Sequence, residues 1–109
     1  MAPRVFITQP AIHKDAQGTS FAADYAPAEC YGELVYVVNS RPMIMDGQEL
    51  ARIEHNLRDF SRDDYLLLSG DPLVCALCAI AAARMTYGFV RMLRYDKRTG
   101  RYTEFVAHF

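Results

Sequence analysis

The segment from Tyr65 to Met85 constrains the fold more than any other part of the sequence. An uninterrupted apolar run, Tyr65 to Leu68, predicts a short buried central strand. Asp71 followed by Pro72 predicts a helix start, because aspartate caps free amide groups and proline lacks the amide that would be unpaired there. The predicted helix, Leu73 to Met85, is apolar nearly all round. It must therefore be sandwiched within the protein or lie in a subunit or partner interface.

A second, amphipathic helix is predicted before this segment. Asp46 and Glu49 have the spacing of a capping box, in which the aspartate accepts an amide hydrogen bond and the glutamate reaches back. The helix should start there and run for about 14 residues with an apolar stripe facing the core. The stripe consists of Leu50, Ile53, Leu57 and Phe60.

The remaining strands are predicted from β-branched and aromatic composition. The run 32–38 is nearly continuous in apolar residues, which predicts burial on both faces, as in a parallel sheet covered by helices. Residues 10–31 have no clear helical or strand period and are expected to form a long loop, which is often functional in a small domain. Gly100 fits the left-handed position that ends a hairpin loop. The other strands expected are 4–9, 89–95 and 101–107.

These elements predict a single α/β domain over residues 1–109, in the order β-β-α-β-α-β-β. A helix separates strands two, three and four, so these strands can be parallel, with right-handed crossovers. The last strand, within the basic hairpin 89–107, is expected to be an antiparallel edge. The sheet is therefore mixed but mainly parallel, with two helices and a C-terminal antiparallel hairpin.

Composition and charge exclude several classes of protein. The 109 residues are 51% hydrophobic and 23% charged, so a packed core is expected. No apolar run approaches the roughly 20 residues of a membrane span, and no secretion signal is evident. Three cysteines suit reduced thiols, which predicts a cytoplasmic protein. The net charge is −1, so any attraction to a polyanion must come from a local patch. Residues 1–83 carry 6 basic and 11 acidic side chains (−5), whereas residues 84–109 carry 6 basic and 2 acidic side chains (+4).

The best candidate for a ligand site is the strand-to-helix turn Ser69, Gly70 and Asp71. It places a helix amino terminus at the carboxyl end of a parallel strand, where open α/β sheets bind anionic ligands. The string Ser-Gly-Asp-Pro resembles a loop of the tetrapyrrole methylases that binds S-adenosylmethionine, although only about eight residues take part. Capping explains Asp71 without a ligand, and its charge would repel a phosphate. No cofactor is therefore predicted.

No other motif predicts catalysis or a metal site. Cys75 and Cys78 have thioredoxin-like spacing, but Cys75 lies about a turn inside the apolar helix, so core packing is the favoured interpretation. A zinc site would need two more ligands, and Cys30 and the three histidines are scattered singly. No serine stands in a recognisable nucleophile frame. An enzyme is therefore the less favoured alternative.

A basic and aromatic cluster marks the C-terminal quarter. Its composition suits phosphate contact and base stacking, and it equally suits docking onto an acidic protein, where tyrosine and arginine are common anchors. Two observations weigh against a single nucleic-acid surface. Arg91 and Arg94 are three positions apart in one strand, so they cannot face the same side, and edge strands often carry basic residues simply to prevent aggregation. The cluster consists of Arg84, Tyr87, Arg91, Arg94, Tyr95, Lys97, Arg98, Arg101 and Tyr102.

Four stretches of the sequence together resemble small uncharacterised proteins of tailed bacteriophages. The stretches are 5–10, 31–35, 65–72 and 95–102. The resemblance implies a virus-encoded protein acting in the cytoplasm of a bacterial host and transfers no catalytic motif.

Three hypotheses about function follow. The first is a non-enzymatic accessory protein that inhibits or modulates a host or viral protein by binding it. The second is a small-ligand, nucleotide-binding or enzymatic domain that uses the Ser69-Gly70-Asp71 turn with loop residues such as Asp24, Tyr25 or Tyr31. The third is nucleic-acid binding through the hairpin. A homodimer would be one way to cover the apolar helix.

Overall fold

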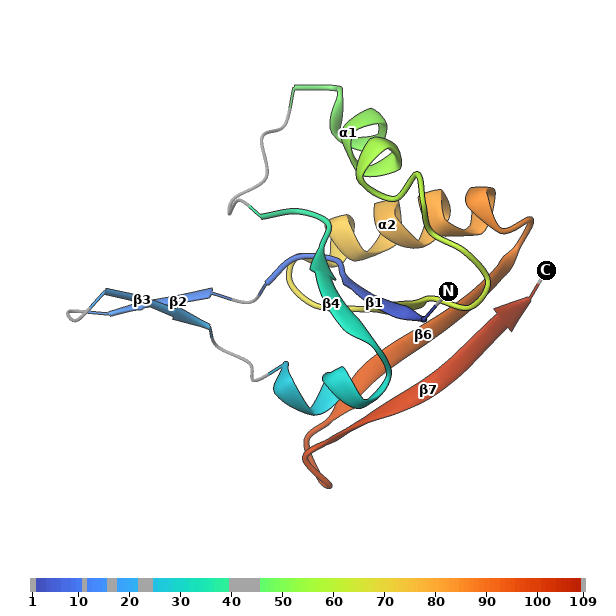
Figure 1. The fold of residues 1–109 in the computed structure, drawn as a ribbon. Coiled ribbons are helices and arrows are strands. Elements are labelled where there is room, and N and C mark those ends of the chain that lie inside the picture. Colours follow the sequence, from blue (N-terminus) through green and yellow to red (C-terminus); the bar gives the residue numbers. More distant parts are fainter. Residues whose placement is uncertain (1, 11, 16–17, 22–24, 40–45, 109) are drawn as a thin grey trace.

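The computed structural model describes residues 2–10, 12–15, 18–21, 25–39 and 46–108. Its main sheet consists of β1 (Arg4–Ile7), β4 (Glu33–Tyr36), β5 (Tyr65–Leu67), β6 (Phe89–Asp96) and β7 (Arg101–His108). The strand order is β4-β1-β5-β6-β7, with β7 antiparallel to β6 and the others parallel (Figure 1). The predicted α/β class, the central buried strand and the antiparallel edge hairpin are confirmed.

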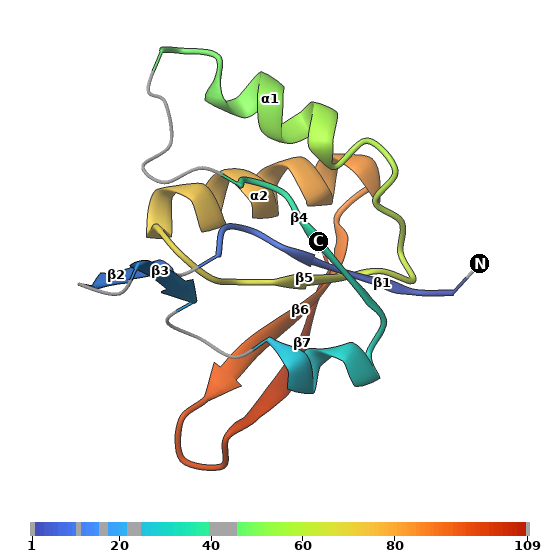
Figure 2. The same ribbon diagram turned by 60° about the vertical axis from the view of Figure 1, so that its left-hand side comes forward.

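The direction of each crossover determines which face of the sheet it covers. From β4 to β5 and from β5 to β6 the chain steps the same way across the sheet, through α1 (Glu49–Asn56) and α2 (Pro72–Met85). Crossovers of one hand that step the same way lie on the same face. Figures 1 and 2 show both helices on that face. From β1 to β4 the chain steps the other way, and the 3₁₀ helix η1 (Ala26–Cys30) covers the opposite face.

Alternating side chains divide the core between these two faces. Phe6, Leu66 and Val90 point towards the helices and pack with Ile53 and Cys78. The alternate strand positions point the other way and pack with Ala28 of η1 and with Tyr25, the residue before it. These positions are Val5, Ile7, Leu67, Leu93 and Tyr102. β4 is covered on both faces as predicted, but only partly, because it is an edge strand.

The segment 10–31 is not an irregular loop, so this prediction was wrong. It contains β2 (Ile12–Asp15) and β3 (Gly18–Phe21), which pair with each other as a separate antiparallel sheet, followed by η1. Each strand is four residues long and pairs only with its neighbour along the chain. Such a short, local ladder needs no sustained apolar alternation, which is the signal that sequence analysis relies on.

The first helix is shorter than predicted and is not capped by Asp46. Its N-cap is Gln48, whose main-chain N–H donates to Asp46 Oδ1 over 3.0 Å. Glu49 Oε1 accepts from the N–H of Gly47 over 3.0 Å, so the two carboxylates brace the preceding turn rather than form the predicted box. The helix ends at Asn56, yet Leu57 and Phe60 are buried in the core as the apolar stripe predicted.

The second helix begins as predicted. Asp71 accepts a hydrogen bond from the N–H of Leu73 over 2.8 Å, and Pro72 occupies the first turn. Within the helix, the side chains of Val74 and Cys78 are buried, whereas those of Leu73 and Ile80 are 47% and 50% exposed. One side of this apolar helix is therefore core and the other is uncovered within the part of the chain described. No helix of that part is long and apolar enough to span a bilayer.

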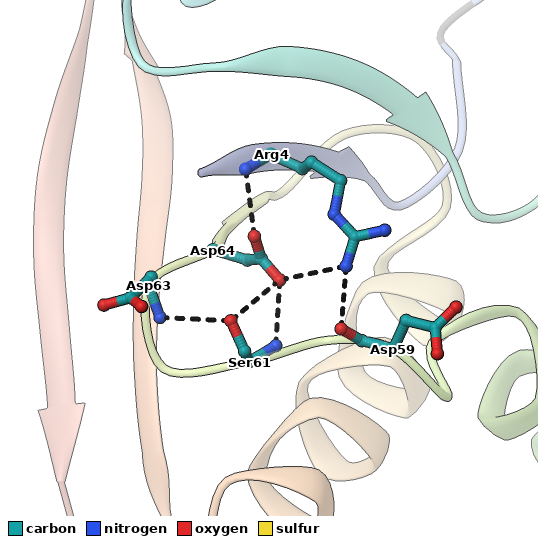
Figure 3. A network of polar contacts seen from close by, with 5 residues as sticks. All are labelled: Arg4, Asp59, Ser61, Asp63 and Asp64. Atoms are coloured by element: carbon teal, nitrogen blue, oxygen red, sulfur yellow. Dashed lines mark hydrogen bonds and ion pairs between the residues drawn. The ribbon is translucent and has the colours of Figure 1, made fainter. Parts of the chain in front are cut away.

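A buried carboxylate fixes the loop between α1 and β5 to the start of β1 (Figure 3). Asp64 is 3% exposed and accepts hydrogen bonds from the main-chain N–H groups of Arg4 and Ser61, both over 2.9 Å. The Ser61 hydroxyl and the Arg4 guanidinium lie at 3.2 and 3.4 Å from the same carboxylate. Asp64 thus fixes where β5 enters the sheet beside β1.

Replacing Asp64 by alanine should lower the free energy of unfolding by about 2 to 3 kcal/mol, because two main-chain donors lose their acceptor. Asp63→Ala is the matched control: Asp63 is exposed, and the change should stay within about 0.5 kcal/mol. Urea unfolding at neutral pH measures both. Equal losses would contradict a structural role for Asp64.

Candidate functional site

The carboxyl ends of β1 and β5 form the topological switch point of the sheet. The two strands are neighbours, and the chain leaves them in opposite directions across the sheet. Open α/β sheets bind ligands in the crevice outside such strand ends. The predicted turn, Ser69 to Asp71, follows β5 directly and therefore lies at this point.

The chain's own side chains occupy the switch point. Thr8 is fully buried, accepts the Ser69 N–H over 2.9 Å and donates its hydroxyl to the Ser69 carbonyl. The hydroxyl groups of Ser69 and Tyr25 lie 2.7 Å apart. Both the main chain and the hydroxyl of Ser69 are thus engaged within the protein.

Gln9 closes the same turn from the other side. It is 1% exposed, and its Oε1 accepts the Asp71 N–H over 2.9 Å. Gly70 has a φ of +89°, and a Cβ there would lie 2.6 Å from Gln9 Oε1 and 2.9 Å from the Gln9 carbonyl oxygen. Only glycine fits this approach. The Asp71 carboxylate accepts the Leu73 N–H, so a carboxylate of the chain itself already occupies the amino terminus of α2.

The structure brings one of the predicted loop residues to the turn. Tyr25 is 5% exposed and its ring centroid lies 6.3 Å from that of Tyr36. Burial, helped by Tyr25 and Glu29, raises the pKa of Tyr36 above its ordinary value. Tyr31 instead lies against Tyr65 and donates its hydroxyl to the Tyr102 carbonyl over 3.2 Å. Asp24 lies outside the described residues.

Thr8 and Gln9 are the site residues that sequence analysis missed. They follow the apolar run of β1 and precede Pro10, a pattern that marks a strand end but does not identify a partner. Their contacts with residues 69 to 71 span about 60 positions of sequence. Only the parallel pairing of β1 with β5 brings these residues together.

The Cys-x-x-Cys pair is part of the same packed region. Cys75 Sγ lies 3.3 Å from the Ser69 carbonyl oxygen. Cys78 is fully buried, and burial, with a smaller contribution from Cys75, raises its pKa to about 12. This is the reverse of what a redox thiol needs. Among the described residues, no group of three His, Cys, Asp or Glu side chains is placed to hold a metal ion.

An open hollow of about 1030 Å³ lies at the amino end of β1, away from the switch point. It is lined by Arg4, Cys30, Tyr31 and Glu33 among others. The Arg4 guanidinium already binds the Asp59 carbonyl over 2.7 Å, and Cys30 Sγ donates to the Pro27 carbonyl. Among its described lining residues, the hollow therefore brings together no set of side chains suited to catalysis.

The turn between β6 and β7 carries an exposed basic cluster, which we call the hairpin tip. It extends beyond η1 at the lower end of the molecule in Figure 2. Gly100 has a φ of +68° and donates to the Asp96 carbonyl over 2.9 Å, as predicted for the end of the loop. Its exposed cations are Arg94, Lys97, Arg98 and Arg101. Of these four cations, only Arg98 has a carboxylate partner among the described residues, Asp96 at 3.4 Å.

The other predicted contact residues do not lie at the tip. Tyr87, 93% exposed, and Arg91, which pairs with Glu104 over 3.2 Å, lie at the opposite end of β6. Tyr102 is 6% exposed and belongs to the core, with its ring centroid 5.3 Å from that of Tyr95. Tyr95, 43% exposed, is therefore the single predicted aromatic residue left accessible beside the tip.

Comparison with known proteins identifies a family. The family model described as Phage Pam3 gp32-like protein matches residues 3–109. No curated protein and no solved structure matches the chain. The match confirms the resemblance to small phage proteins and adds no functional residue.

In the folded protein, iodoacetamide at pH 8 should alkylate exposed Cys30 and leave Cys78 unmodified until urea is added. Mass spectrometry of the peptides measures both. Because burial raises the Cys78 pKa from its ordinary value of 9.0 to about 12, the free energy of unfolding should also fall as pH rises between those values. Equal rates of alkylation at the two cysteines would contradict a packing role for Cys78.

Proposed function

Because the chain belongs to the Phage Pam3 gp32-like protein family, we propose that it acts for the phage by binding another protein, without catalysing a reaction. The contact surface in this proposal is the hairpin tip, and the partner presents acidic side chains. The observation that carries the proposal is the set of tip cations without a carboxylate partner among the described residues, Arg94, Lys97 and Arg101.

The state of the switch point supports binding over catalysis. Thr8 accepts the Ser69 N–H, and Gln9 accepts the Asp71 N–H. The Asp71 carboxylate caps the amino terminus of α2. A ligand would have to displace these contacts before it could reach a donor. Ligand binding at the Ser69-Gly70-Asp71 turn is for this reason the weaker candidate.

The distribution of charge supports an acidic partner. The segment that includes the tip has an excess of four positive charges, whereas the first 83 residues have an excess of five negative charges. An acidic surface is therefore attracted to the tip and repelled by much of the remaining chain, which orients the encounter. Half-exposed Tyr95 adds an aromatic anchor of the kind common at protein interfaces.

Nucleic-acid binding is a second candidate on the same cations, and two observations make it weaker. Stacking on bases needs several accessible rings, and burial of Tyr102 leaves Tyr95 alone beside the tip. A polyanion that extends past the tip would also meet the acidic part of the chain. A folded acidic protein can avoid both difficulties by contacting the tip alone.

Reversing two of the tip cations, Lys97→Glu with Arg101→Glu, should abolish capture of the partner from a lysate of phage-infected bacteria. The matched control is Arg58→Glu with Arg62→Glu, which changes net charge equally at exposed positions beyond the other end of the parallel strands. The measurement is affinity purification with quantitative mass spectrometry, with and without nuclease. Circular dichroism confirms that each variant is folded.

Three outcomes separate the candidates. A stoichiometric protein that survives nuclease, stays with the control and is lost from the tip variant supports the proposal. A partner lost on nuclease treatment favours nucleic acid. Equal capture by the tip variant and the wild-type protein contradicts a role for the tip.

A further inference from the structure

The outer edge of β7 presents main-chain N–H and C=O groups that point away from the rest of the sheet. The N–H of Leu68 donates to the Leu93 carbonyl over 3.1 Å, so the main-chain groups of Leu93 point towards β5. Its cross-strand partner Glu104 therefore occupies a non-hydrogen-bonded position of the β6-β7 pair. By the antiparallel alternation, the N–H and C=O groups of Tyr102, Glu104, Val106 and His108 point away from β6.

One end of this edge is covered and the rest is open. The Tyr31 hydroxyl donates to the Tyr102 carbonyl, which places η1 against that end of β7. Glu104, Val106 and His108 have no such cover among the described residues. Natural edge strands are usually protected by proline, bulges or dense charge. This one instead exposes apolar side chains, Phe105 at 66% and Val106 at 43%.

We propose that the open edge of β7 pairs with the same edge of a second copy of this chain, antiparallel and centred on Val106. In this register Val106 faces Val106 of the second copy, and Glu104 faces His108 of the second copy. All three open residues of each strand are then paired, and the covered Tyr102 is not needed. The ladder supplies about six main-chain hydrogen bonds.

The alternative registers are less complementary. Centring on Glu104 sets two carboxylates face to face, which is unfavourable for directly opposed residues. Centring on Phe105 sets His108 against the covered Tyr102 and leaves Glu104 opposite Val106. Only the register centred on Val106 combines full pairing of the open residues with a carboxylate opposite an imidazole, which can donate a hydrogen bond to it.

Side chains on both faces of the edge fit this register. On one face, Glu104 pairs with Arg91 over 3.2 Å, and the His108 ring packs edge-on against Phe89 with the ring centroids 5.4 Å apart. On the helix face, Phe105 borders an open groove of about 330 Å³ with Leu68 and Met92. Pairing sets Phe105 opposite Ala107 of the second copy and diagonal to the other Phe105, which removes apolar surface from water.

The proposed dimer would place its two hairpin tips at opposite ends of a continuous sheet. From Val106 to the tip is seven residues, so the tips would lie roughly 45 Å apart at about 3.3 Å per residue. If the tips bind an acidic protein, as proposed above, the dimer is bivalent, whereas the pairing itself does not depend on that function.

The main test is the molar mass in solution at the highest soluble concentration, by light scattering after size exclusion. The wild-type protein should have twice the monomer mass of 12.4 kDa. Val106→Pro should be a monomer, because its N–H points outward and proline is tolerated at such an edge position. Val106→Lys should also be a monomer through repulsion at the centre, and Val106→Thr, which keeps the N–H and the β-branched shape, should remain a dimer.

The register has its own test. His108→Glu alone, and Glu104→Lys combined with His108→Lys, should each be monomeric, because each sets like charges opposite one another, and an equimolar mixture of the two should form a heterodimer. A monomeric wild-type protein would overturn the proposal, as would a dimer that persists in both Val106→Pro and Val106→Lys. A mixture that stays monomeric would overturn the register. None of these results depends on the hairpin tip or on its partner.

Discussion

The contact between Gln9 and Gly70 is the constraint on which the rest of the structure depends. It joins the end of β1 to the turn after β5, and it is close enough that a side chain at position 70 would overlap Gln9. The same turn leads directly into the cap of α2. The contact therefore fixes the pairing of the two central strands and the starting point of the helix that covers them.

The closed switch point has a consequence for function. In many α/β proteins the crevice between diverging crossovers is the ligand site. Here Thr8 and Ser69 satisfy each other's polar groups, and Gln9 accepts the Asp71 N–H, so the turn has a structural role. The accessible features that we use lie on the C-terminal hairpin, where three tip cations have no carboxylate partner among the described residues and β7 has an open edge. Both proposals place binding on this one element.

Local signals predicted the parts of the fold that depend on local interactions. The Asp71-Pro72 start of α2 and the Gly100 end of the hairpin loop are examples, because each depends on a residue's own conformation or a neighbouring amide. The central position of β1 and the contacts of Thr8 and Gln9 were not predictable, since parallel pairing joins residues about 60 positions apart. Burial of Tyr102 likewise depends on its cross-strand partner Tyr95 and on η1.

The most direct test of the closed switch point compares the free energies of unfolding of Gly70→Ala and Gly47→Ala. The two glycines have φ values of +89° and +85°, but nothing lies within 4 Å of a Cβ built at Gly47. Both substitutions should cost about 1 to 2 kcal/mol for the left-handed backbone. Gly70→Ala should cost about 1 to 3 kcal/mol more, because its methyl group meets Gln9. Equal losses would mean that Gln9 does not close the turn and would contradict the account.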